Sequence, residues 1–524
     1  MTRITDLKFD RPVEFPGEKV CTVEELDVLA QAARAAGRTV VLAHGVFDLL
    51  HLGHVRHLEA ARRLGDLLFV TITADRFVNK GPGRPIFSEM LRAEMLASLS
   101  LVDRVAINGT ATAESVLRLV RPDVYVKGSD YENADDDVTG KIEAERRMVE
   151  SHGGRIEFTK GITFSSSGLI NRYMDVYDPP LRELLTEMRQ GGASGRLLGL
   201  LDKVKDYRVV LVGETIIDDY QYVSPVGKSS KENIIATRYL GEEHFAGGVI
   251  AAANHVAGFC REVDVITIIG DRDRERDEAL IRSVLLPNVR LHVVCRRDAP
   301  TVRKRRFVEE GTIHKLFEVQ FLDDTPLPLA EADELNALAR RLVSEADVTI
   351  AADFGHGMIG AETVDILCSS ARFLAVNTQS NSANMGFNFI HKYPRADYVC
   401  IDAPEARLAT GDRFAPISEI ASRRLPERIR CPRIVITHGK NGCHVFDAES
   451  GERQIPVLTK VVRDTMGAGD AFLAVTSPLA AAGGAMNDVG FIGNAVGAIK
   501  VGIVGHRGPV EKVPLVKFIT ALLK

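Results

Sequence analysis

The sequence predicts an α/β protein of two domains, each built on a mainly parallel β-sheet. A chain of 524 residues exceeds the size at which one hydrophobic core keeps growing. Short β-rich runs alternate with helical stretches, a pattern typical of parallel sheets covered by helices. This alternation stops at a proline pair and the stretch "QGGASG", and then begins again. We therefore expect domains at residues 20–175 and 205–524, joined by a linker at 176–204.

Four β-rich runs define the first domain. The predicted strands are "TVVLAH" (39–44), "LLFVTIT" (67–73), "RVAING" (104–109) and "DVYVKG" (123–128). Helical stretches such as "HVRHLEAARRLG" and "SEMLRAEMLASL" lie between them. The order predicts a Rossmann-like parallel sheet with helices on both faces.

The second domain begins with "RVVLVG" at 208–213, and strand–helix alternation continues to Lys524. Two segments, 219–245 and 301–321, depart from it, because polar and apolar residues alternate there without intervening helices. They predict antiparallel strands that stand off the main sheet, as a small β lid or a dimer clasp.

The composition narrows the class of protein. Apolar residues make up 45% and charged residues 26%, and the net charge of -5 shows no basic footprint, so we expect no nucleic-acid partner. No apolar run approaches the 18 residues of a membrane span, and the N-terminus lacks the apolar core of a signal peptide. The seven cysteines are scattered without a CxxC pair, which argues for reduced thiols in the cytoplasm and against a zinc site.

The stretch "HGVFDLLHLGH" (44–54) places two histidines where a strand gives way to a helix. Backbone N–H groups at such a helix start favour anions, and Gly53 lets a phosphate approach the backbone. Two imidazoles there, His51 and His54, can stabilise the charge of a pentacoordinate α-phosphate. A metal site would need a third ligand, for which Asp48 is the candidate. The alternative is a pair of solvent-facing histidines in a loop.

Further segments of the first domain end strands or begin helices in the same way. They are "NKGPGRP" (79–85), "SEMLRAEM" (88–95), "VKGSDY" (126–131) and "FSSSGLI" (164–170). Each alone is more often a loop or a helix cap, but four in order suggest one ligand site at the carboxyl edge of a sheet. Besides the two histidines, the candidate nucleotide- and phosphate-binding residues are Gly45, Phe47, Asp48, Gly53, Lys80, Arg84, Arg92, Lys127, Asp130, Ser165, Ser166 and Ser167.

The stretch "VVRDTMGAGDAF" (461–472) carries the second site. Gly467, Ala468 and Gly469 let consecutive N–H groups converge at a helix start, which forms an anion hole for phosphoryl transfer. Asp470 is placed there to take a proton from an attacking hydroxyl. The alternative is a glycine turn with an aspartate N-cap.

Three companions of this stretch complete the predicted kinase site. "THGKNG" (437–442) is a turn able to lie over nucleotide phosphates, and "GNAVGAIKVGIVG" (493–505) offers small residues to an adenine ring. "FAGGVIAAANHVAG" (245–258) places two glycines at a helix mouth, where substrate hydroxyls bind. The nucleotide-binding candidates are Thr437, Gly439, Gly442, Thr465, Gly467, Ala468, Gly469 and Asn494, and the substrate-binding candidates are Asp218, Gly247, Gly248 and Asp353.

The first set of motifs resembles the HxGH nucleotidyltransferase superfamily over residues 20–175. Within it, "GVFDLLHLGH", "GRPIFSE", "VKGSDY" and "SSSGLI" look most like the adenylyltransferase half of the bifunctional heptose-phosphate kinase/adenylyltransferases. The glycerol-phosphate cytidylyltransferases share the HxGH stretch. The resemblance implies that a sugar 1-phosphate attacks the α-phosphorus of ATP or CTP, with Mg²⁺ present and pyrophosphate lost. His51 and His54 would polarise the phosphates, helped by Lys80, Arg92 and Ser166, with Asp130 near the base or sugar.

The second set resembles the PfkB (ribokinase-like) sugar kinases across residues 205–520, and "VVLVGETIIDDY" and "ADFGHG" lean toward heptose kinases. The resemblance implies Asp470 as the base, Gly467 to Gly469 as the anion hole and Asp218 as a ligand of sugar hydroxyls. Asp402 and Glu405 occupy the family's Asn-x-x-Glu site that organises Mg²⁺ through water, and Asn494 would lie by the adenine.

The sequence departs from the sugar kinases around the presumed sugar pocket. The usual GGxxN asparagine is missing, and Asn254 falls out of step. His356 stands where heptose kinases tend to carry lysine, and the asparagine-rich 377–394 replaces a short "DPKG"-like segment. The domain order is also opposite to that of the common heptose enzymes, so we interpret the chain as an independent fusion.

These features predict a bifunctional cytoplasmic enzyme of nucleotide-sugar synthesis. ATP would be the phosphoryl donor, ATP or CTP the nucleotidyl donor, Mg²⁺ the cofactor, and a sugar or sugar phosphate the substrate. The alternatives are a kinase/cytidylyltransferase for another sugar or polyol, and a sugar-sensing protein with a degenerate kinase half. We also expect a homodimer through the β lid.

Overall fold

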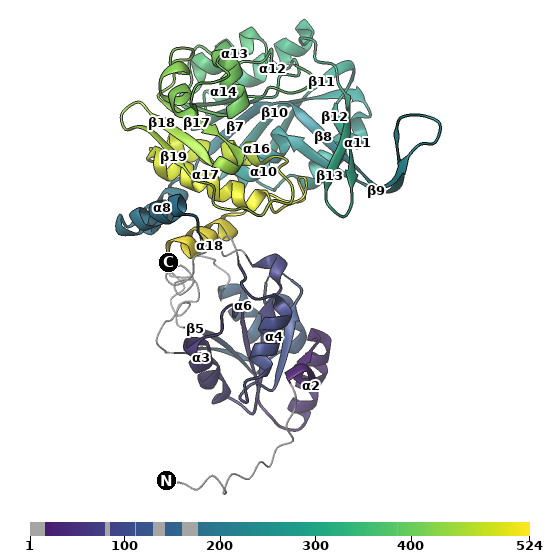
Figure 1. Cartoon of the computed structure of the whole chain (residues 1–524), viewed down its shortest axis with the longest axis vertical. Helices are drawn as coiled ribbons and strands as arrows, with labels where there is room; N and C mark the ends of the chain where they lie inside the picture. Colours follow the sequence, from purple (N-terminus) through teal and green to yellow (C-terminus); the bar gives the residue numbers. More distant parts are fainter. Residues whose placement is uncertain (1–15, 79–83, 111, 129–141, 160–176, 385) are drawn as a thin grey trace. The chain divides into compact units, whose positions relative to one another are not determined.

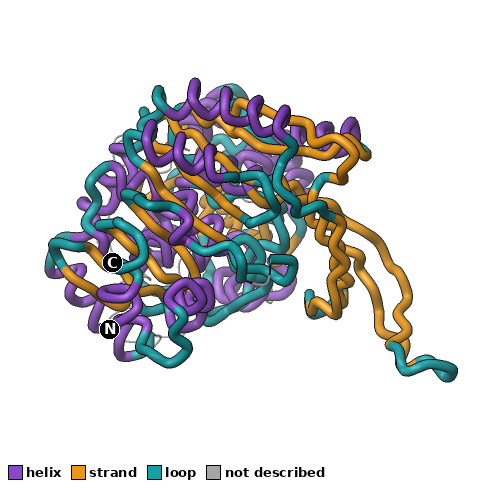
Figure 2. The backbone as a smooth tube through the Cα atoms, turned by 90° about the horizontal axis from the view of Figure 1, so that it is seen from above, coloured by secondary structure: helices purple, strands orange, loops and turns teal. Residues whose placement is uncertain are grey.

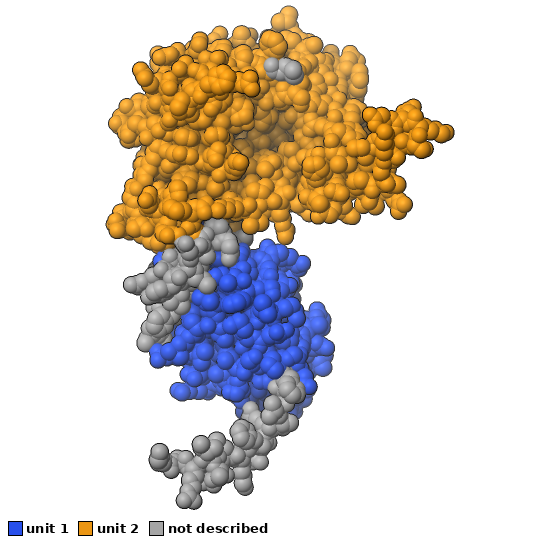
Figure 3. All heavy atoms as spheres, in the orientation of Figure 1, with its two compact units in different colours: residues 1–176, 520–522, 524 blue, residues 177–519, 523 orange. Residues whose placement is uncertain are grey.

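The computed structural model describes residues 16–78, 84–110, 112–128, 142–159, 177–384 and 386–524. The chain forms two compact units (Figure 3). Unit 1 is Met1–Val176 with Thr520–Leu522 and Lys524, and unit 2 is Tyr177–Ile519 with Leu523. Each unit is an α/β structure, which confirms the predicted fold class.

Unit 1 contains a parallel sheet with the strand order β1-β4-β3-β2-β5-β6 (Figure 1). The strands are β1 (Val20–Cys21), β2 (Val40–Gly45), β3 (Leu67–Thr73), β4 (Arg104–Asn108), β5 (Val124–Gly128) and β6 (Arg155–Thr159). The helices are α1 (Pro16–Lys19), α2 (Val23–Ala35), α3 (Leu52–Arg62), η2 (Asp75–Phe77), α4 (Glu89–Ala97), α5 (Glu114–Val120) and α6 (Ile142–Glu150). The four predicted strands are β2 to β5, whereas the short β1 and the edge strand β6 were not predicted.

Alternation along β2 divides the core of unit 1 into two layers. Val41 and Ala43 face a cluster with α3 and α4, while Val40 and Leu42 face a cluster with α2 and α5. The helices therefore cover both faces, as the βαβ pattern requires. This arrangement leaves the carboxyl edge of the sheet for ligands.

Unit 2 has a main sheet with the strand order β11-β10-β7-β14-β15-β16-β17-β18-β19. It is parallel up to β17 and antiparallel beyond it. The strands are β7 (Arg208–Gly213), β10 (Glu262–Arg272), β11 (Val289–Pro300), β14 (Val348–Asp353), β15 (Leu374–Thr378), β16 (Tyr398–Asp402), β17 (Arg433–Thr437), β18 (Cys443–Asp447) and β19 (Gly451–Ile455).

The helices of unit 2 cover this sheet on both sides. One face packs with α12, α13 and α14 into a large apolar cluster, and α10 and α16 pack on the strands from the other side. The helices are α8 (Pro179–Gln190), α9 (Ala193–Lys203), α10 (Val249–Ala257), α11 (Arg274–Val284), α12 (Leu329–Val343), α13 (Ala361–Ser370), η5 (Ile390–Lys392), α14 (Ala403–Thr410), α15 (Ile417–Glu419), η6 (Ile420–Arg424), η7 (Gly439–Asn441), α16 (Ala468–Ala481), α17 (Met486–Lys500) and α18 (Lys512–Leu523).

A second sheet of unit 2, the β lid, has the order β13-β12-β8-β9. Its strands are β8 (Thr215–Lys228), β9 (Ile235–Gly248), β12 (Val302–Glu309) and β13 (His314–Phe321), which project from the main body in Figures 1 and 2. The hairpins β8–β9 and β12–β13 are antiparallel, as predicted. The sequence did not predict that they join through the parallel pair β8 and β12. That pairing follows because β8 continues β7 and β12 continues β11, and both parent strands run the same way.

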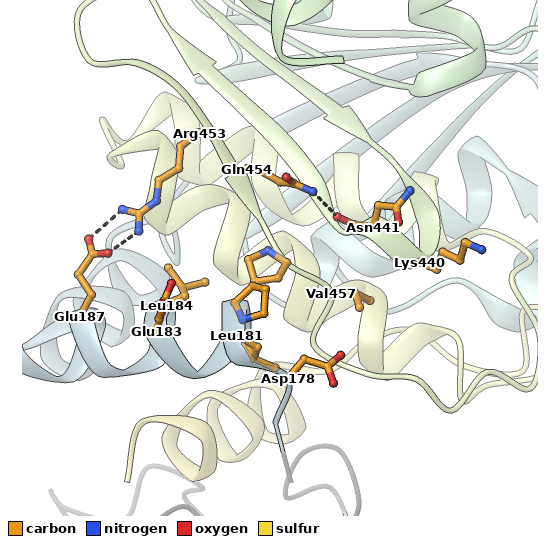
Figure 4. Close-up of a pocket in the computed structure, with 12 residues that line it drawn as sticks. Asp178, Leu181, Glu183, Leu184, Glu187, Lys440, Asn441, Arg453, Gln454 and Val457 are labelled. Atoms are coloured by element: carbon orange, nitrogen blue, oxygen red, sulfur yellow. Dashed lines mark hydrogen bonds and ion pairs between the residues drawn. The ribbon is translucent and has the colours of Figure 1, made fainter. Parts of the chain in front are cut away.

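Residues of the predicted linker form two helices that lie in unit 2. Helix α8 begins with two prolines in its first turn, where their missing N–H groups cost nothing, and it buries four apolar side chains. Glu187 on its exposed face pairs with Arg453 of β19 (Figure 4). The linker is therefore helical and packed over most of its length. None of the helices in the described ranges is long and apolar enough to cross a membrane.

Candidate active sites

In unit 1, the loop between β2 and α3 has a constrained shape. Phe47 and Leu49 adopt left-handed backbone conformations, with φ of 50° and 51°, which residues other than glycine rarely occupy. The Phe47 ring is buried and meets the His54 ring edge-on, with centroids 5.3 Å apart. A Cβ atom on Gly45 would approach that Phe47 ring to 3.1 Å, so a small residue is favoured there. The packing thus holds the loop in one conformation, as functional loops often are.

The two predicted histidines lie together at the first turn of α3. His51 is the N-cap residue, and its Nδ1 accepts a hydrogen bond of 3.1 Å from the Gly53 N–H. This assigns the proton of the neutral ring to Nε2. The rings of His51 and His54 stack with centroids 3.9 Å apart and an interplanar angle of 18°. Burial lowers the pKa of His51, which favours the neutral ring. The structure therefore brings both histidines to a helix N-terminus, where an anion is favoured.

Asp48 stabilises the loop that carries the two histidines. Its carboxylate is 3% exposed and accepts hydrogen bonds from the backbone N–H groups of Ile86 (3.0 Å) and Phe87 (3.2 Å). These bonds hold the chain that follows the 79–83 stretch against the loop. Both oxygens of the Asp48 carboxylate are engaged by the backbone, which gives this residue a structural role in the loop.

Arg92 has a similar role inside the domain. Its guanidinium donates to the carbonyl oxygens of Val46, Phe87 and Thr73 and pairs with Asp75 at 2.6 Å. The side chain is fully buried. Direct contact with a nucleotide phosphate would require it to leave these partners. In this structure Arg92 fixes the loop that carries Phe47 to the start of α4.

The remaining predicted phosphate-binding residues of unit 1 include Lys127 and Arg84, and a third histidine lies near Lys127. Lys127 at the end of β5 pairs with Glu145 at 2.8 Å, and Arg84 is half-buried. His57, which the sequence did not single out, places Nδ1 2.7 Å from the Thr159 hydroxyl. Burial first and Lys127 second lower the pKa of His57 to about 4. Five predicted residues lie outside the described ranges: Lys80, Asp130, Ser165, Ser166 and Ser167.

In unit 2, helix α16 begins as the sequence predicts. Gly467 is its N-cap residue with a φ of 68°, and Ala468, Gly469 and Asp470 form the first turn. Among the described residues none makes a hydrogen bond or an ion pair with the Asp470 carboxylate. Burial raises the pKa of Asp470, although nearby His506 opposes the shift. An unpaired carboxylate with a raised pKa suits a general base. Figure 3 shows unit 2 hollowed where Figure 1 labels α16 and α10.

Asp218 of β8 is a buried acid held by two side chains. It is 2% exposed, pairs with Arg306 of β12, and lies 3.2 Å from Nε2 of His506. Burial alone would raise the pKa of Asp218, but the His506 hydrogen bond and the Arg306 charge lower it below its usual range. A Cβ on Gly247 would lie 2.2 Å from the Asp218 carboxylate, so only glycine fits there. Gly248, with a φ of 58°, then begins α10. The structure therefore groups Asp218 with both predicted glycines.

Asp353 lies at the end of β14 and is 1% exposed. Its carboxylate accepts from the Tyr393 hydroxyl at 2.8 Å, pairs with Lys392, and also binds Asn388. Asn381 and Asn384 donate to the backbone carbonyl of Phe354. These contacts explain the asparagine-rich segment, whose amides hold the turn after β14. Asp353 is thus saturated by protein groups and would contact a substrate only if these bonds rearranged.

The same turn is held from the other side by Glu214, which the sequence did not single out. Its buried carboxylate accepts from the N–H groups of Phe354 and His356, both at 3.0 Å. Burial first and Asp353 second raise the pKa of Glu214 to about 7. Asn254, the out-of-step asparagine, bonds to the backbone of Val284 and Leu286 and has a structural role.

Asp402 and Glu405, the predicted magnesium residues, form a capping box at the start of α14. Each side chain accepts from the other's backbone N–H at 2.8 Å. Burial raises the pKa of both carboxyls, and the Asp402 charge helps to bring that of Glu405 to about 8. The two carboxylates repel each other, and their oxygens are the ligands that a hard divalent cation prefers. The chemistry of this pair therefore fits Mg²⁺.

The predicted nucleotide residues occupy the loops beside these acids. Gly439 (φ 51°) begins η7 after Thr437, and Gly442 has a φ of 83°. A Cβ on Gly442 would lie 2.0 Å from the Ile455 carbonyl oxygen, so glycine is required. Asn494 of α17 donates to the carbonyls of Ile455 and Pro456, and Thr465 is exposed.

A pocket of about 420 Å³ lies between α8 and the η7 turn (Figure 4). Its lining includes Lys440, Asn441 and Gln454. Asp470 and Asp218 do not line it, so it borders the predicted phosphate turn without containing the predicted chemistry.

Two stretches of the chain match known families. Residues 42–172 match the cytidylyltransferase-like family, and residues 330–513 match the pfkB family of carbohydrate kinases. The chain joins a cytidylyltransferase-like domain to a PfkB kinase domain. This confirms the family resemblance predicted for both halves.

The N-terminal part is also similar to curated proteins named bifunctional protein HldE. The protein of Syntrophotalea carbinolica is 40% identical over 163 residues, which are 30% of this chain and 32% of the relative. That of Methylobacillus flagellatus is 43% identical over 141 residues, 26% of this chain and 28% of the relative. The match thus spans about a third of these relatives' length. Phosphofructokinase-2 from Escherichia coli aligns over 61% of this chain and 100% of its own, with 14% identity and a TM-score of 0.48.

Two further residues beside the candidate site of the PfkB domain were not singled out by the sequence. Asp464 accepts from the Tyr220 hydroxyl (2.9 Å) and Lys315 (2.6 Å), which ties the loop before α16 to the β lid. Lys500 donates to the carbonyls of Met466 and Gly505, and burial lowers its pKa to about 8. The position of Asp464 inside the quoted glycine-rich stretch was the available signal.

We expect Arg92→Lys to destabilise the cytidylyltransferase-like domain. Lysine keeps the charge but cannot reach several acceptors at once, which leaves buried carbonyl oxygens unpaired at about 1–3 kcal/mol each. The unfolding temperature should fall by several degrees in thermal denaturation followed by circular dichroism. Arg118→Lys, at an exposed position of α5, is the control. An unchanged unfolding temperature would contradict the structural role.

Proposed function

We propose that the chain is a bifunctional cytoplasmic enzyme of nucleotide-sugar synthesis. Its PfkB domain would phosphorylate a sugar with ATP, and its cytidylyltransferase-like domain would transfer a nucleotidyl group to a sugar 1-phosphate. The observation that carries the proposal is the unpaired Asp470 carboxylate in the first turn of α16, beside the converging N–H groups of Gly467 to Gly469. The stacked histidines at the start of α3 support the second activity.

In the kinase reaction, a sugar hydroxyl would lie between Asp218 and Asp470. Asp470 takes its proton as the oxygen attacks the γ-phosphorus, a new O–P bond forms, and the bond to the β-phosphate oxygen breaks to release ADP. The N–H groups at Gly467 to Gly469 stabilise the charge that develops on the phosphoryl oxygens. Asp402 and Glu405 would hold Mg²⁺ through water, which supplies neutralisation of the triphosphate.

In the second reaction, a phosphate oxygen of the sugar 1-phosphate attacks the α-phosphorus of ATP or CTP. The bond between the α- and β-phosphates breaks and pyrophosphate leaves. His51 and His54 donate to the α-phosphate, whose charge increases in the transition state.

A heptose phosphate is the substrate class that the resemblance favours for the kinase. The expected sugar side of the PfkB domain nevertheless departs from the family pattern, because the Asn381, Asn384 and Asn388 amides brace the turn after β14. We therefore propose a sugar or sugar phosphate of heptose-like size, to be tested in a panel that includes hexoses and polyols.

Paired substitutions test the two activities separately. His54→Ala should abolish pyrophosphate release and leave sugar-dependent ADP formation intact, whereas Asp470→Asn should lower ADP formation about 10³-fold or more and spare pyrophosphate release. The exposed controls His152→Ala and Asp333→Asn should retain both activities. Products of ATP, CTP and the sugar panel are identified by mass spectrometry. Sugar binding without turnover by the wild type would instead support a sugar sensor.

The pH dependence of the kinase should reflect Asp470. The base acts when deprotonated, and burial raises its pKa above the ordinary 3.8. Activity is therefore lost as the pH falls through a value higher than that of an exposed aspartate. The measurement is kcat/KM for the sugar from about pH 3.5 to pH 9, with the enzyme's folded state verified in parallel at each pH. A profile that stays flat to the acid end would contradict the assignment.

We also propose that the β lid pairs with a second copy of the chain. Its edge strands are β9 and β13, and exposed apolar side chains gather on its outer parts. They are Val226, Ile234, Ile235, Tyr239, Leu240, Phe317, Val319 and Phe321.

Light scattering at micromolar concentration should give twice the mass of one chain. Ile235→Lys combined with Tyr239→Lys should shift the protein to a monomer, because charges on an apolar contact must be desolvated. Leu329→Lys, at an exposed apolar position outside the lid, should remain dimeric. A wild-type protein that is monomeric under these conditions would refute the proposal.

A further inference from the structure

His506 lies where the sugar side and the phosphate side of the kinase site meet. It follows Gly505 in the loop after α17. Its Nε2 is 3.2 Å from the Asp218 carboxylate. A Cβ built on Gly247 would approach the same nitrogen to 3.0 Å, and one on Gly467 would approach Cε1 to 2.5 Å and Nδ1 to 3.2 Å. The imidazole therefore fills the space between Gly247 and Gly467, the N-cap residue of α16.

The second ring nitrogen has no protein partner. The His506 side chain is 5% exposed, and Nδ1 is buried without a hydrogen bond to any described residue. A buried polar atom left unpaired is costly and uncommon in native structures, and each case calls for an explanation. Here the nitrogen lies against Gly467, whose helix start is an anion site. Both observations indicate a ligand that completes the bonding of His506.

We propose that His506 is a catalytic residue of the kinase reaction, which binds the transferring phosphoryl group through Nδ1. The inference rests on the proposed kinase function. With a phosphoryl group in the anion hole, the ring carries protons on both nitrogens and donates Nε2–H to Asp218 and Nδ1–H to a phosphoryl oxygen. Asp218 thus orients the ring, and His506 adds a side-chain donor to the N–H groups of Gly467 to Gly469.

The alternative is that His506 only positions Asp218. The two roles use different ring nitrogens. They can therefore be separated by substituting glutamine or asparagine for His506, because each amide side chain replaces only one of the two nitrogens. Glutamine reaches the Nε2 position and keeps the bond to Asp218, but places no donor at Nδ1. Asparagine is shorter and places its amide near Nδ1, but it loses Asp218. His292→Gln is a matched control, since His292 donates to buried Asp264 near the amino end of β10.

The experiment measures kcat and the sugar KM of each variant at saturating ATP. We expect His506→Gln to lower kcat about 10²–10³-fold, the usual effect of removing one such donor, with the sugar KM nearly unchanged. His506→Asn should raise the sugar KM and retain a kcat at least about tenfold above that of the glutamine variant. His292→Gln should behave as the wild type. Unfolding temperatures establish that each variant is folded.

Other outcomes overturn the inference. A glutamine variant with wild-type kcat, or an asparagine variant with a kcat no higher than the glutamine variant, would leave His506 as a positioning residue for Asp218. If the glutamine variant unfolds early, His506→Lys replaces it, because an ammonium group also reaches the carboxylate and leaves the Nδ1 position empty. If the wild type and His292→Gln form no ADP with any sugar, the kinase proposal itself fails, an outcome distinct from a defect confined to His506.

Discussion

The buried carboxylate of Asp218 is the constraint on which the candidate site of the PfkB domain depends. It binds Arg306, which is 88 residues away, and His506 of the loop after α17, so it joins β8, β12 and the C-terminal part of the domain. A carboxylate buried this deeply is stable only when cations and donors offset its lost hydration. Those partners fix the β lid against the start of α16. The geometry of this candidate site is therefore a consequence of how one acid is neutralised.

In the cytidylyltransferase-like domain, buried polar side chains fix the shape of the loop between β2 and α3. Asp48 and Arg92 hold backbone groups around the loop that carries Phe47. These bonds engage two side chains that the sequence assigned to phosphate binding, and they hold the loop in one conformation. A loop held in this way presents the two histidines and the N–H groups of α3 without reorganisation, which is what electrostatic stabilisation of a transition state requires.

Local features of these sites could be predicted from the sequence, and tertiary features could not. The strand–loop–helix setting of His51 and Asp470 is encoded within about ten consecutive residues, because small residues before an apolar helix determine where N–H groups converge. The parallel contact of β8 with β12 depends on the direction of distant strands. Asp464 binds Lys315 across 149 residues, and Glu214 binds a turn about 140 residues away. Asp464 stands inside the glycine-rich stretch, but nothing in that stretch names its distant partners, and Glu214 stands in no pattern that distinguishes it from a surface residue.

The charge distribution around Asp470 explains how a base and several cations coexist in one cleft. An ion pair would lower the pKa of Asp470 and make it a weaker base, whereas burial raises that pKa. Two neighbouring cations are engaged elsewhere, since Arg306 binds Asp218 and Lys500 binds two backbone carbonyls. Lys304, which is buried near both acids, makes no ion pair with the described residues. The positive field of His506, Lys304 and Lys500 lowers the pKa of Asp470, but burial outweighs this field, so the carboxylate keeps its affinity for a proton.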